Sequence, residues 1–271
     1  MITSTSNLQV KQLLQLQKKA KERNAQKVFV VEGPKMALEV PGEQLVQTYV
    51  SERFFEKNPV FFGEDRPVTV LSDRVFESVS DTRTPQGVLC IVRQYHYEAE
   101  ELLGKPPAGT ARAPLIVALE NLQDPGNLGT IVRTAEGAGV TGILLSQDCV
   151  DLYNPKVIRS TMGAIYRMPF YYADDFRQEL RILQGKGMRL FAAHLEGSIP
   201  YDEETYCGSS GFLIGNESQG LTRETAALAD ARIRIPMCGR VESLNAAVAA
   251  SVLMYEANRQ RRKSTGRAGR G

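Results

Sequence analysis

Short apolar runs alternate with helical patterns from residue 114 onward, and this alternation is the feature that most constrains the fold. Strands are predicted at residues 115–119, 142–145, 168–172, 189–194, 212–214 and 233–235. Because helix patterns lie between most of these runs, we expect an α/β domain with a mostly parallel sheet that helices cover on both faces. The last predicted helix spans residues 244–262 and carries a small-to-apolar stripe, which is typical of core packing or of a subunit interface.

The first 95 residues form a separate region of alternating helix and strand patterns. An amphipathic helix is predicted over residues 7–24 with Asn7 as its N-cap. Further patterns follow at residues 28–31, 34–40, 45–50, 68–71, 75–80 and 88–92. Residues 96–113 have little periodicity and contain Gly and Pro, so we predict a linker there. The predicted organisation is a domain at 1–95, a linker at 96–113, a domain at 114–263 and a disordered tail at 264–271.

Charge and cysteine content exclude some classes of protein. The 271 residues carry a net charge of only +2, but residues 11–27 hold six Lys or Arg with one acid, and residues 259–270 hold six with none. Such clusters suit a polyanionic partner, or else a solvated helix face and a tail. The four scattered cysteines and two histidines form no zinc-binding pattern. Without a transmembrane run or a signal peptide, we expect a cytoplasmic protein and no membrane partner.

A polar segment follows the first strand of the later region. It contains Asn127 and Arg133, and open α/β sheets bind ligands at the carboxyl ends of their strands. Both are therefore candidate site residues, although an arginine at such a position can also be a surface residue paired with Glu136. A nucleotide phosphate loop is not indicated, because GxxxxGK[ST] is absent and no GxGxxG follows a strand.

Two more polar segments lie at later strand ends. Residues 215–220 form a glycine-flanked loop that fits either a ligand loop or a plain strand-to-helix turn. Ser243 can simply cap the last helix, whereas the amide of Asn245 on an Ala/Val-rich helix needs a partner. His194 ends another strand, a place more typical of a packing or hydrogen-bonding histidine than of a general base.

The three segments together resemble the three motifs of the SpoU (TrmH-like) family of AdoMet-dependent RNA ribose 2'-O-methyltransferases, in the SPOUT superfamily. The motifs correspond to residues 121–138, 213–221 and 233–249. Residues 6–11, 29–33 and 84–88 resemble the small ribosomal-protein-like RNA-binding domain that many members carry. The resemblance implies a trefoil knot at the carboxyl end of the SPOUT domain, an AdoMet pocket in that knot, and a homodimer with catalytic residues at its interface.

The resemblance also implies roles for individual residues. Arg133 would activate the ribose 2'-hydroxyl, although a guanidinium stays protonated and would need a neighbouring group or would only orient the hydroxyl. The other catalytic residues would be Asn127, Glu217, Ser243 and Asn245. The AdoMet pocket would be formed by His194, Leu195, Ile214, Gly215, Asn216, Ile235, Met237, Ser243 and Leu244. The sulfonium of AdoMet makes its methyl group reactive, so no metal is expected.

The substrate and the activity have alternatives. The N-terminal region favours structured rRNA of the large subunit as the substrate, with tRNA as the alternative. A non-catalytic RNA-binding or ribosome-assembly factor would have the same fold, but the five candidate catalytic residues together argue against a loss of activity. The missing glycine fingerprint argues against a dinucleotide-binding enzyme.

Overall fold

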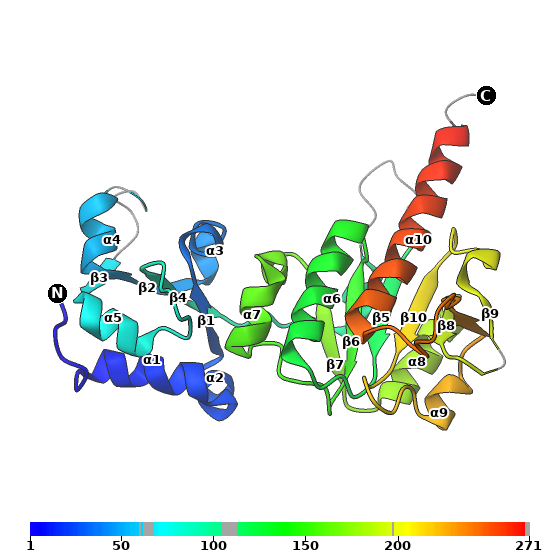
Figure 1. Ribbon diagram of the computed structural model, residues 1–271, viewed down its shortest axis with the longest axis horizontal. Coiled ribbons are helices and arrows are strands. Elements are labelled where there is room, and N and C mark those ends of the chain that lie inside the picture. Colours follow the sequence, from blue (N-terminus) through cyan, green and yellow to red (C-terminus); the bar gives the residue numbers. More distant parts are fainter. Residues whose placement is uncertain (60, 62–67, 105–112, 197, 269–271) are drawn as a thin grey trace. The chain divides into compact units, whose positions relative to one another are not determined.

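The computed structural model describes residues 1–59, 61, 68–104, 113–196 and 198–268 (Figure 1). The chain divides into two compact units. Unit 1 comprises Met1–Tyr95 and Asp151–Tyr166, and unit 2 comprises His96–Val150 and Arg167–Gly271. The sequence patterns did not indicate that residues 151–166 belong with the N-terminal region.

Unit 1 contains a mixed sheet of four strands. They are β1 (Val28–Glu32), β2 (Leu45–Ser51), β3 (Val68–Leu71) and β4 (Val88–Arg93), in the order β1-β4-β2-β3. Strand β4 is antiparallel to β1 and β2, whereas β2 and β3 are parallel. Each strand corresponds to an apolar run in the sequence, because β1, β2 and β4 bury most of their side chains and the residues of β3 are at least partly buried.

Five helices from the N-terminal part of unit 1 accompany this sheet among its described residues. They are α1 (Leu8–Lys18), α2 (Ala20–Gln26), α3 (Pro34–Leu38), α4 (Glu52–Lys57) and α5 (Asp73–Val79), with a short 3-10 helix η1 (Gly42–Gln44). Asn7 caps α1, since its Oδ1 accepts a hydrogen bond from the Gln9 amide at 2.9 Å. The extended backbone of Lys19 divides the predicted helix of residues 7–24 into α1 and α2.

Residues 151–166 complete the core of unit 1. They form α7 (Pro155–Thr161) and the 3-10 helix η3 (Ala164–Tyr166). Asp151 pairs with the buried Arg23 at 2.5 Å, and the Tyr166 hydroxyl donates to the Met36 carbonyl at 3.0 Å. A buried guanidinium that loses its partner is strongly destabilising, so unit 1 depends on this segment.

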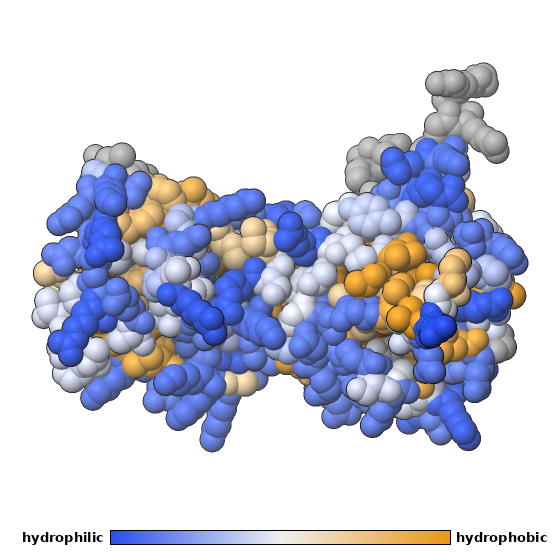
Figure 2. Space-filling view, viewed as in Figure 1, coloured by the Kyte–Doolittle hydropathy of each residue, from blue (hydrophilic) through white to orange (hydrophobic). Residues whose placement is uncertain are grey.

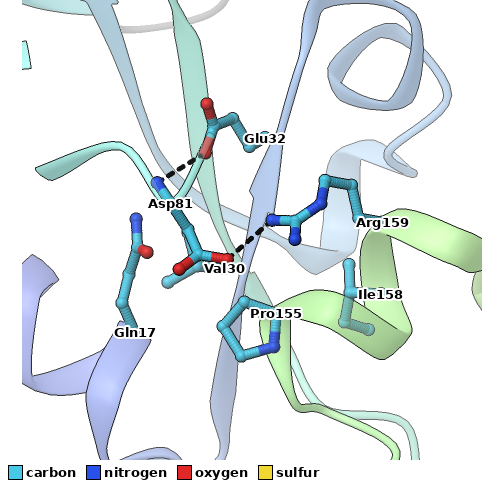
Figure 3. A pocket seen from close by; sticks show the side chains of 7 residues that line it. All are labelled: Gln17, Val30, Glu32, Asp81, Pro155, Ile158 and Arg159. Atoms are coloured by element: carbon cyan, nitrogen blue, oxygen red, sulfur yellow. Dashed lines mark hydrogen bonds and ion pairs between the residues drawn. The ribbon is translucent and has the colours of Figure 1, made fainter. Parts of the chain in front are cut away.

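A small cavity lies between α7 and β1 (Figure 3). Its volume is about 10 Å³, which is room for one water molecule. Arg159 points from α7 to Asp81 and pairs with its carboxylate at 2.6 Å, and the Asp81 amide donates to Glu32 at 3.1 Å. These charged groups are engaged with one another, so the cavity is part of the packing of unit 1.

Unit 2 is built on a seven-stranded sheet. Its strands are β5 (Leu115–Leu119), β6 (Gly142–Ser146), β7 (Phe170–Ala173), β8 (Arg189–Ala193), β9 (Ile199–Pro200), β10 (Ser210–Ile214) and β11 (Ala231–Arg234). The order is β7-β6-β5-β10-β8-β11-β9, and all neighbours are parallel. This confirms the predicted α/β class and parallel sheet. The short β9 was not predicted.

Helices cover both faces of the parallel sheet. They are α6 (Pro125–Ala138), α8 (Phe176–Gly185), α9 (Arg223–Ala226) and α10 (Ala246–Ala268), with the 3-10 helices η2 (Ala99–Leu103) and η4 (Tyr201–Glu203). On one face Ile116 and Ala118 of β5 pack with Leu180 and Leu183 of α8. Alternate strand residues point to the opposite face, where α6 and α10 lie side by side (Figure 1).

Part of the predicted linker is folded against the sheet of unit 2. Leu102 of η2 is fully buried. A Cβ at residue 142 would lie 2.6 Å from the Leu102 Cα, so glycine at the start of β6 makes room for η2. The rest of the predicted linker, residues 105–112, lies outside the described residues.

The last helix is shifted relative to its prediction. α10 begins at Ala246 and continues to Ala268, whereas the sequence pattern predicted residues 244–262. Residues 264–268, which were predicted as the start of a disordered tail, are therefore helical. Among the helices of the described chain, none is long and apolar enough to cross a membrane.

Candidate active site

The candidate site residues gather at one edge of the sheet of unit 2. The three motif segments follow β5, β10 and β11, and His194 follows β8. Strands β5, β10, β8 and β11 are consecutive neighbours and parallel, so their carboxyl ends lie at the same edge. The order of the strands also reverses at β5: β6 and β7 extend the sheet on one side of β5, and the later strands extend it on the other. Ligand sites of α/β proteins form at such a reversal.

The first motif ends in a well-defined helix start. Asp124 is the N-cap of α6, because its Oδ1 accepts a hydrogen bond from the Asn127 amide at 2.8 Å. Pro125 occupies the first helical position, where the missing N–H has no cost. Asn127, at 9% exposure, is almost buried in the first turn. Its side-chain amide is therefore held in one position.

Glu217 of the second motif joins this helix start. Its carboxylate accepts hydrogen bonds from Asn127 Nδ2 at 3.0 Å, from the Gln123 amide at 3.1 Å and from the Asp124 amide at 2.9 Å. An anion is favoured at a helix N-terminus, where backbone N–H groups lack partners within the helix. Glu217 thus connects the loop after β10 to the loop after β5.

These hydrogen bonds set the charge of the site. Burial raises the pKa of Glu217, but the hydrogen bonds from Asn127 and from the backbone amides of Asp124 and Gln123 outweigh it. The pKa of Glu217 therefore lies below its ordinary value. The carboxylate is ionised at neutral pH and acts as an acceptor.

Asn245 of the third motif closes the network. Its Nδ2 donates to Asn127 Oδ1 at 2.9 Å, while its own Oδ1 accepts from the Ala247 amide at 2.9 Å. The amide that the sequence pattern left without a partner thus has one, and Asn245 caps α10. Ser243, considered above as that cap, is exposed and precedes the helix start. Glu217, Asn127 and Asn245 together link all three motifs.

Arg133 does not join this network. Arg133 follows Asn127 by six positions, which correspond to about 600° of helix rotation and place Arg133 about 120° away from the Asn127 face. Its side chain is exposed, and no hydrogen bond or ion pair engages it within the described part of the chain. Glu136, a possible partner in the sequence, instead pairs with Arg167 at 3.0 Å. Arg133 is thus available to a ligand or to another chain.

Several residues that were predicted to line the AdoMet pocket stabilise the loop after β10. Ile214 is buried at 3% exposure. A Cβ on Gly215 would lie 2.2 Å from the Leu221 amide nitrogen, so only glycine lets the loop return past this point. Asn216 Oδ1 accepts from the amides of Ser218 and Gln219, and its Nδ2 donates to the Asn121 carbonyl at 2.8 Å. These contacts fix the loop that carries Glu217.

The remaining predicted pocket residues are more open. The His194 ring accepts a hydrogen bond at Nδ1 from the Glu196 amide at 3.1 Å, and the neighbouring Leu195 is 59% exposed. Ile235, Met237 and Leu244 are each partly buried. Within the described residues, no hydrogen bond uses the backbone of residues 236–244. This segment therefore presents backbone donors and acceptors beside apolar side chains.

The sequence patterns missed one structural residue at this edge. Asn121 follows β5 with a φ of 54°, a conformation that asparagine tolerates better than most residues. Its side-chain Oδ1 accepts a hydrogen bond from Ser146 Oγ at 3.1 Å, and its backbone carbonyl accepts one from Asn216 Nδ2. The signal in the sequence was an asparagine directly after a buried strand end.

Two arginines of the basic segments are not part of any charged surface. Arg23 is 3% exposed and pairs with Asp151 in unit 1. Arg261 is 7% exposed and donates to the carbonyls of Tyr206, Gly208, Ala113 and Pro114 in unit 2. Across the described residues, no group of three or more His, Cys, Asp or Glu side chains is placed to hold a metal ion.

Comparison with known proteins identifies the family. Residues 114–255 match the SpoU rRNA Methylase family, and residues 7–90 match the MRM3-like substrate binding domain. An uncharacterized tRNA/rRNA methyltransferase of Synechocystis is 35% identical over 96% of this chain and 93% of its own length. The 23S rRNA (guanosine(2553)-2'-O)-methyltransferase RlmP of Bacillus subtilis is 30% identical over 94% of this chain and 97% of its own.

A solved structure agrees with these relatives. The AdoMet-bound rRNA methyltransferase from Sinorhizobium meliloti superposes with a TM-score of 0.82 at 30% identity, over 95% of this chain and 97% of that chain. The chain belongs to the SpoU rRNA methylase family. This confirms the family that the three motifs resemble, and the small N-terminal substrate-binding domain.

Proposed function

We propose that this protein transfers the methyl group of AdoMet to a ribose 2'-hydroxyl of RNA, with large-subunit rRNA as the substrate. The single observation that carries the proposal is the chain of hydrogen bonds from Glu217 through Asn127 to Asn245. It joins the three family motifs at the sheet edge where ligands of such folds bind. The relative RlmP, named as a 23S rRNA 2'-O-methyltransferase, supports the reaction and the substrate.

Arg133 orients the 2'-hydroxyl in this proposal. Its guanidinium has no partner among the described residues, so it can donate to a ribose oxygen and to the adjacent phosphate. Because a guanidinium stays protonated, the hydroxyl proton leaves to another acceptor. Asn127 and Asn245 are positioning residues that fix the start of α6, and Glu217 holds that start to the loop after β10. Ser243 offers an exposed hydroxyl to the same site.

The residues at the sheet edge fit AdoMet. The backbone of residues 236–244 offers hydrogen-bonding groups to the adenosine and methionine parts, and the exposed Leu195 with the partly buried Ile235 and Leu244 offers apolar contact to the adenine ring. His194, Ile214, Gly215, Asn216 and Met237 shape the rest of this pocket. Bound AdoMet supplies a methyl group on a positively charged sulfur, and the protein then contributes mainly positioning. The trefoil knot that the family implies stays a prediction.

The protein acts as a homodimer in this proposal. Val248 and Tyr255 lie about two turns apart on α10 and are 48% and 51% exposed. Figure 2 shows hydrophobic residues gathered over the start of α10 and hydrophilic residues over its far end. A second copy of this chain would cover these side chains and bring an RNA-contacting surface to Arg133. We further propose a cytoplasmic location, where ribosomal RNA is modified.

Transfer of radiolabelled methyl groups tests the function. Wild-type protein and Arg133→Ala are incubated with labelled AdoMet and either total rRNA or total tRNA. We expect label in large-subunit rRNA with the wild type and a loss of label with Arg133→Ala. Label in tRNA alone would show that the substrate is tRNA and not rRNA. No label in either pool, with no AdoMet binding, would leave a non-catalytic RNA-binding protein.

A further inference from the structure

Unit 1 carries a pocket that methyl transfer leaves unassigned. Its volume is about 320 Å³, and its lining comes from the segment 51–58, the start of α5 and the loop 84–87. Pockets that hold small ligands measure about 300–1,000 Å³. All of these segments lie within the stretch that matches a substrate binding domain, residues 7–90. Its volume and its place in this stretch together make the pocket a candidate site for part of a substrate.

The walls of the pocket are fixed by close packing. Gly87 has a φ of +84°, and a Cβ there would lie 2.7 Å from the Phe54 Cβ and 2.8 Å from Ser51 Oγ. Only glycine lets the loop 84–87 approach α4 this closely. The Phe54 ring makes an edge contact with Phe61, at 5.1 Å between centroids. Phe54 is thus a positioned, partly exposed aromatic side chain in the wall.

The charges in the lining balance one another. Arg53 pairs with Asp73 at 3.4 Å, and its backbone amide donates to the same carboxylate at 3.1 Å. Lys57 and Glu77 contribute one charge of each sign. A phosphate group would need an excess of positive charge here. The lining instead suits a neutral ligand.

Amide groups at the pocket provide hydrogen-bonding capacity. Asn58 uses its Nδ2 on the Phe54 carbonyl at 3.0 Å. The exposed Gln86 side chain makes no hydrogen bond to the part of the chain that the structure describes, so both its donor and its acceptor are available. An amide with both groups free can read the edge of a nucleobase.

We propose that this pocket binds an unpaired nucleobase of the substrate RNA, with Phe54 stacking on the base and Gln86 contacting its edge. The inference rests on the proposed function for the identity of the substrate. Single-stranded bases that turn out of the helix and stack on aromatic side chains are the usual targets of sequence-specific RNA recognition. The pocket lining belongs to unit 1, whereas the candidate methyl-transfer residues belong to unit 2. The proposal therefore gives the bound base a role in recognition and not in methyl transfer.

Steady-state methylation by the full-length protein tests this role. The pocket variants are Phe54→Leu and Gln86→Ala. The control variants are Phe55→Leu, at a neighbouring exposed phenylalanine, and Gln44→Ala, because neither Phe55 nor Gln44 lines the pocket. We expect the two pocket variants to raise the KM for RNA about tenfold with kcat unchanged, because stacking on one base is worth a factor of this size. The two controls keep the wild-type KM.

An abasic scan separates recognition from a merely structural effect. Bases are removed one at a time from the unpaired positions of the RNA fragment that the wild type methylates. We expect one position, other than the methylated one, at which base removal weakens the wild type but has no further effect on Phe54→Leu or Gln86→Ala. Wild-type KM values in both variants, or no such position, would overturn the pocket proposal while methylation persists. A wild type that methylates no RNA would instead overturn the proposed function.

Discussion

Replacement of Glu217 by alanine tests how the motifs are held together. A hydrogen bond to a charged group is worth about 1.5–3 kcal/mol when water is excluded, so three of them would total about 4–9 kcal/mol. Glu217 is an exposed residue, however, and water replaces much of this interaction when the carboxylate is removed. Exposed charge interactions contribute about 0–1 kcal/mol each. We therefore expect Glu217→Ala to destabilise the start of α6 by about 1–2 kcal/mol.

Amide hydrogen exchange is the suitable assay, because the chain has two units and its unfolding need not be two-state. The amides of Gln123 and Asp124 donate directly to Glu217, so their exchange should become about 5–30 times faster in Glu217→Ala at pH 7. Glu224→Ala is the control, since this exposed glutamate of α9 makes no hydrogen bond or ion pair within the described residues. Equal exchange in the two variants would refute the connecting role of Glu217.

The same comparison has a pH dependence of known sign. The pKa of Glu217 is lowered in the folded protein, so the stabilisation is complete above the pKa of an unfolded glutamate, about 4.3. It is lost as the pH falls through the lower folded pKa. The difference in exchange between wild type and Glu217→Ala, corrected for intrinsic rates, should therefore shrink below about pH 4. A difference that persists there would show that the charge is not responsible.

Substitutions at three further residues have distinct expected outcomes. Arg133→Ala should leave the free energy of unfolding within about 0.5 kcal/mol of wild type, because this exposed side chain makes no hydrogen bond or ion pair to the described residues. The same variant should lower methyl transfer at least about 100-fold. Thermal unfolding and radiolabel transfer check the two expectations. Asn245→Ala should cost about 1 kcal/mol through loss of the α10 cap. Asn245→Asp should regain that stability in denaturant titration but not the hydrogen bond to Asn127 or full activity. Arg261→Met should destabilise unit 2 by about 3 kcal/mol or more, since buried carbonyls lose their donor; a smaller shift in the denaturation midpoint would argue against this.

The strands of unit 2 could be predicted because the sheet is covered on both faces. Residues such as 115–119 are entirely buried and form a continuous apolar run. The order of the strands was not visible in the sequence, because β10 inserts between β5 and β8, and the pairing of distant strands leaves no local pattern. The short β9 has too few residues to show a periodicity.

The site was only partly accessible from sequence for a related reason. The motifs named Asn127, Glu217 and Asn245, but hydrogen bonds between residues so far apart along the chain depend on tertiary structure. The cap of α10 is Asn245, two residues later than Ser243, because the Asn245 side chain is the one that reaches the first free amides of the helix. Arg133 and Asn127 were both predicted as site residues, and the helix places their side chains about 120° apart.

The place of residues 151–166 in unit 1 has a consequence for how the protein is made. The chain passes from one unit to the other at residues 95–96, 150–151 and 166–167. During translation the N-terminal residues leave the ribosome first, but the buried Arg23 lacks its carboxylate partner until Asp151 follows. Unit 1 can therefore complete its core only after the first strands of unit 2 have emerged. A chimera that exchanges the substrate-binding domain between relatives must carry residues 151–166 together with 1–95.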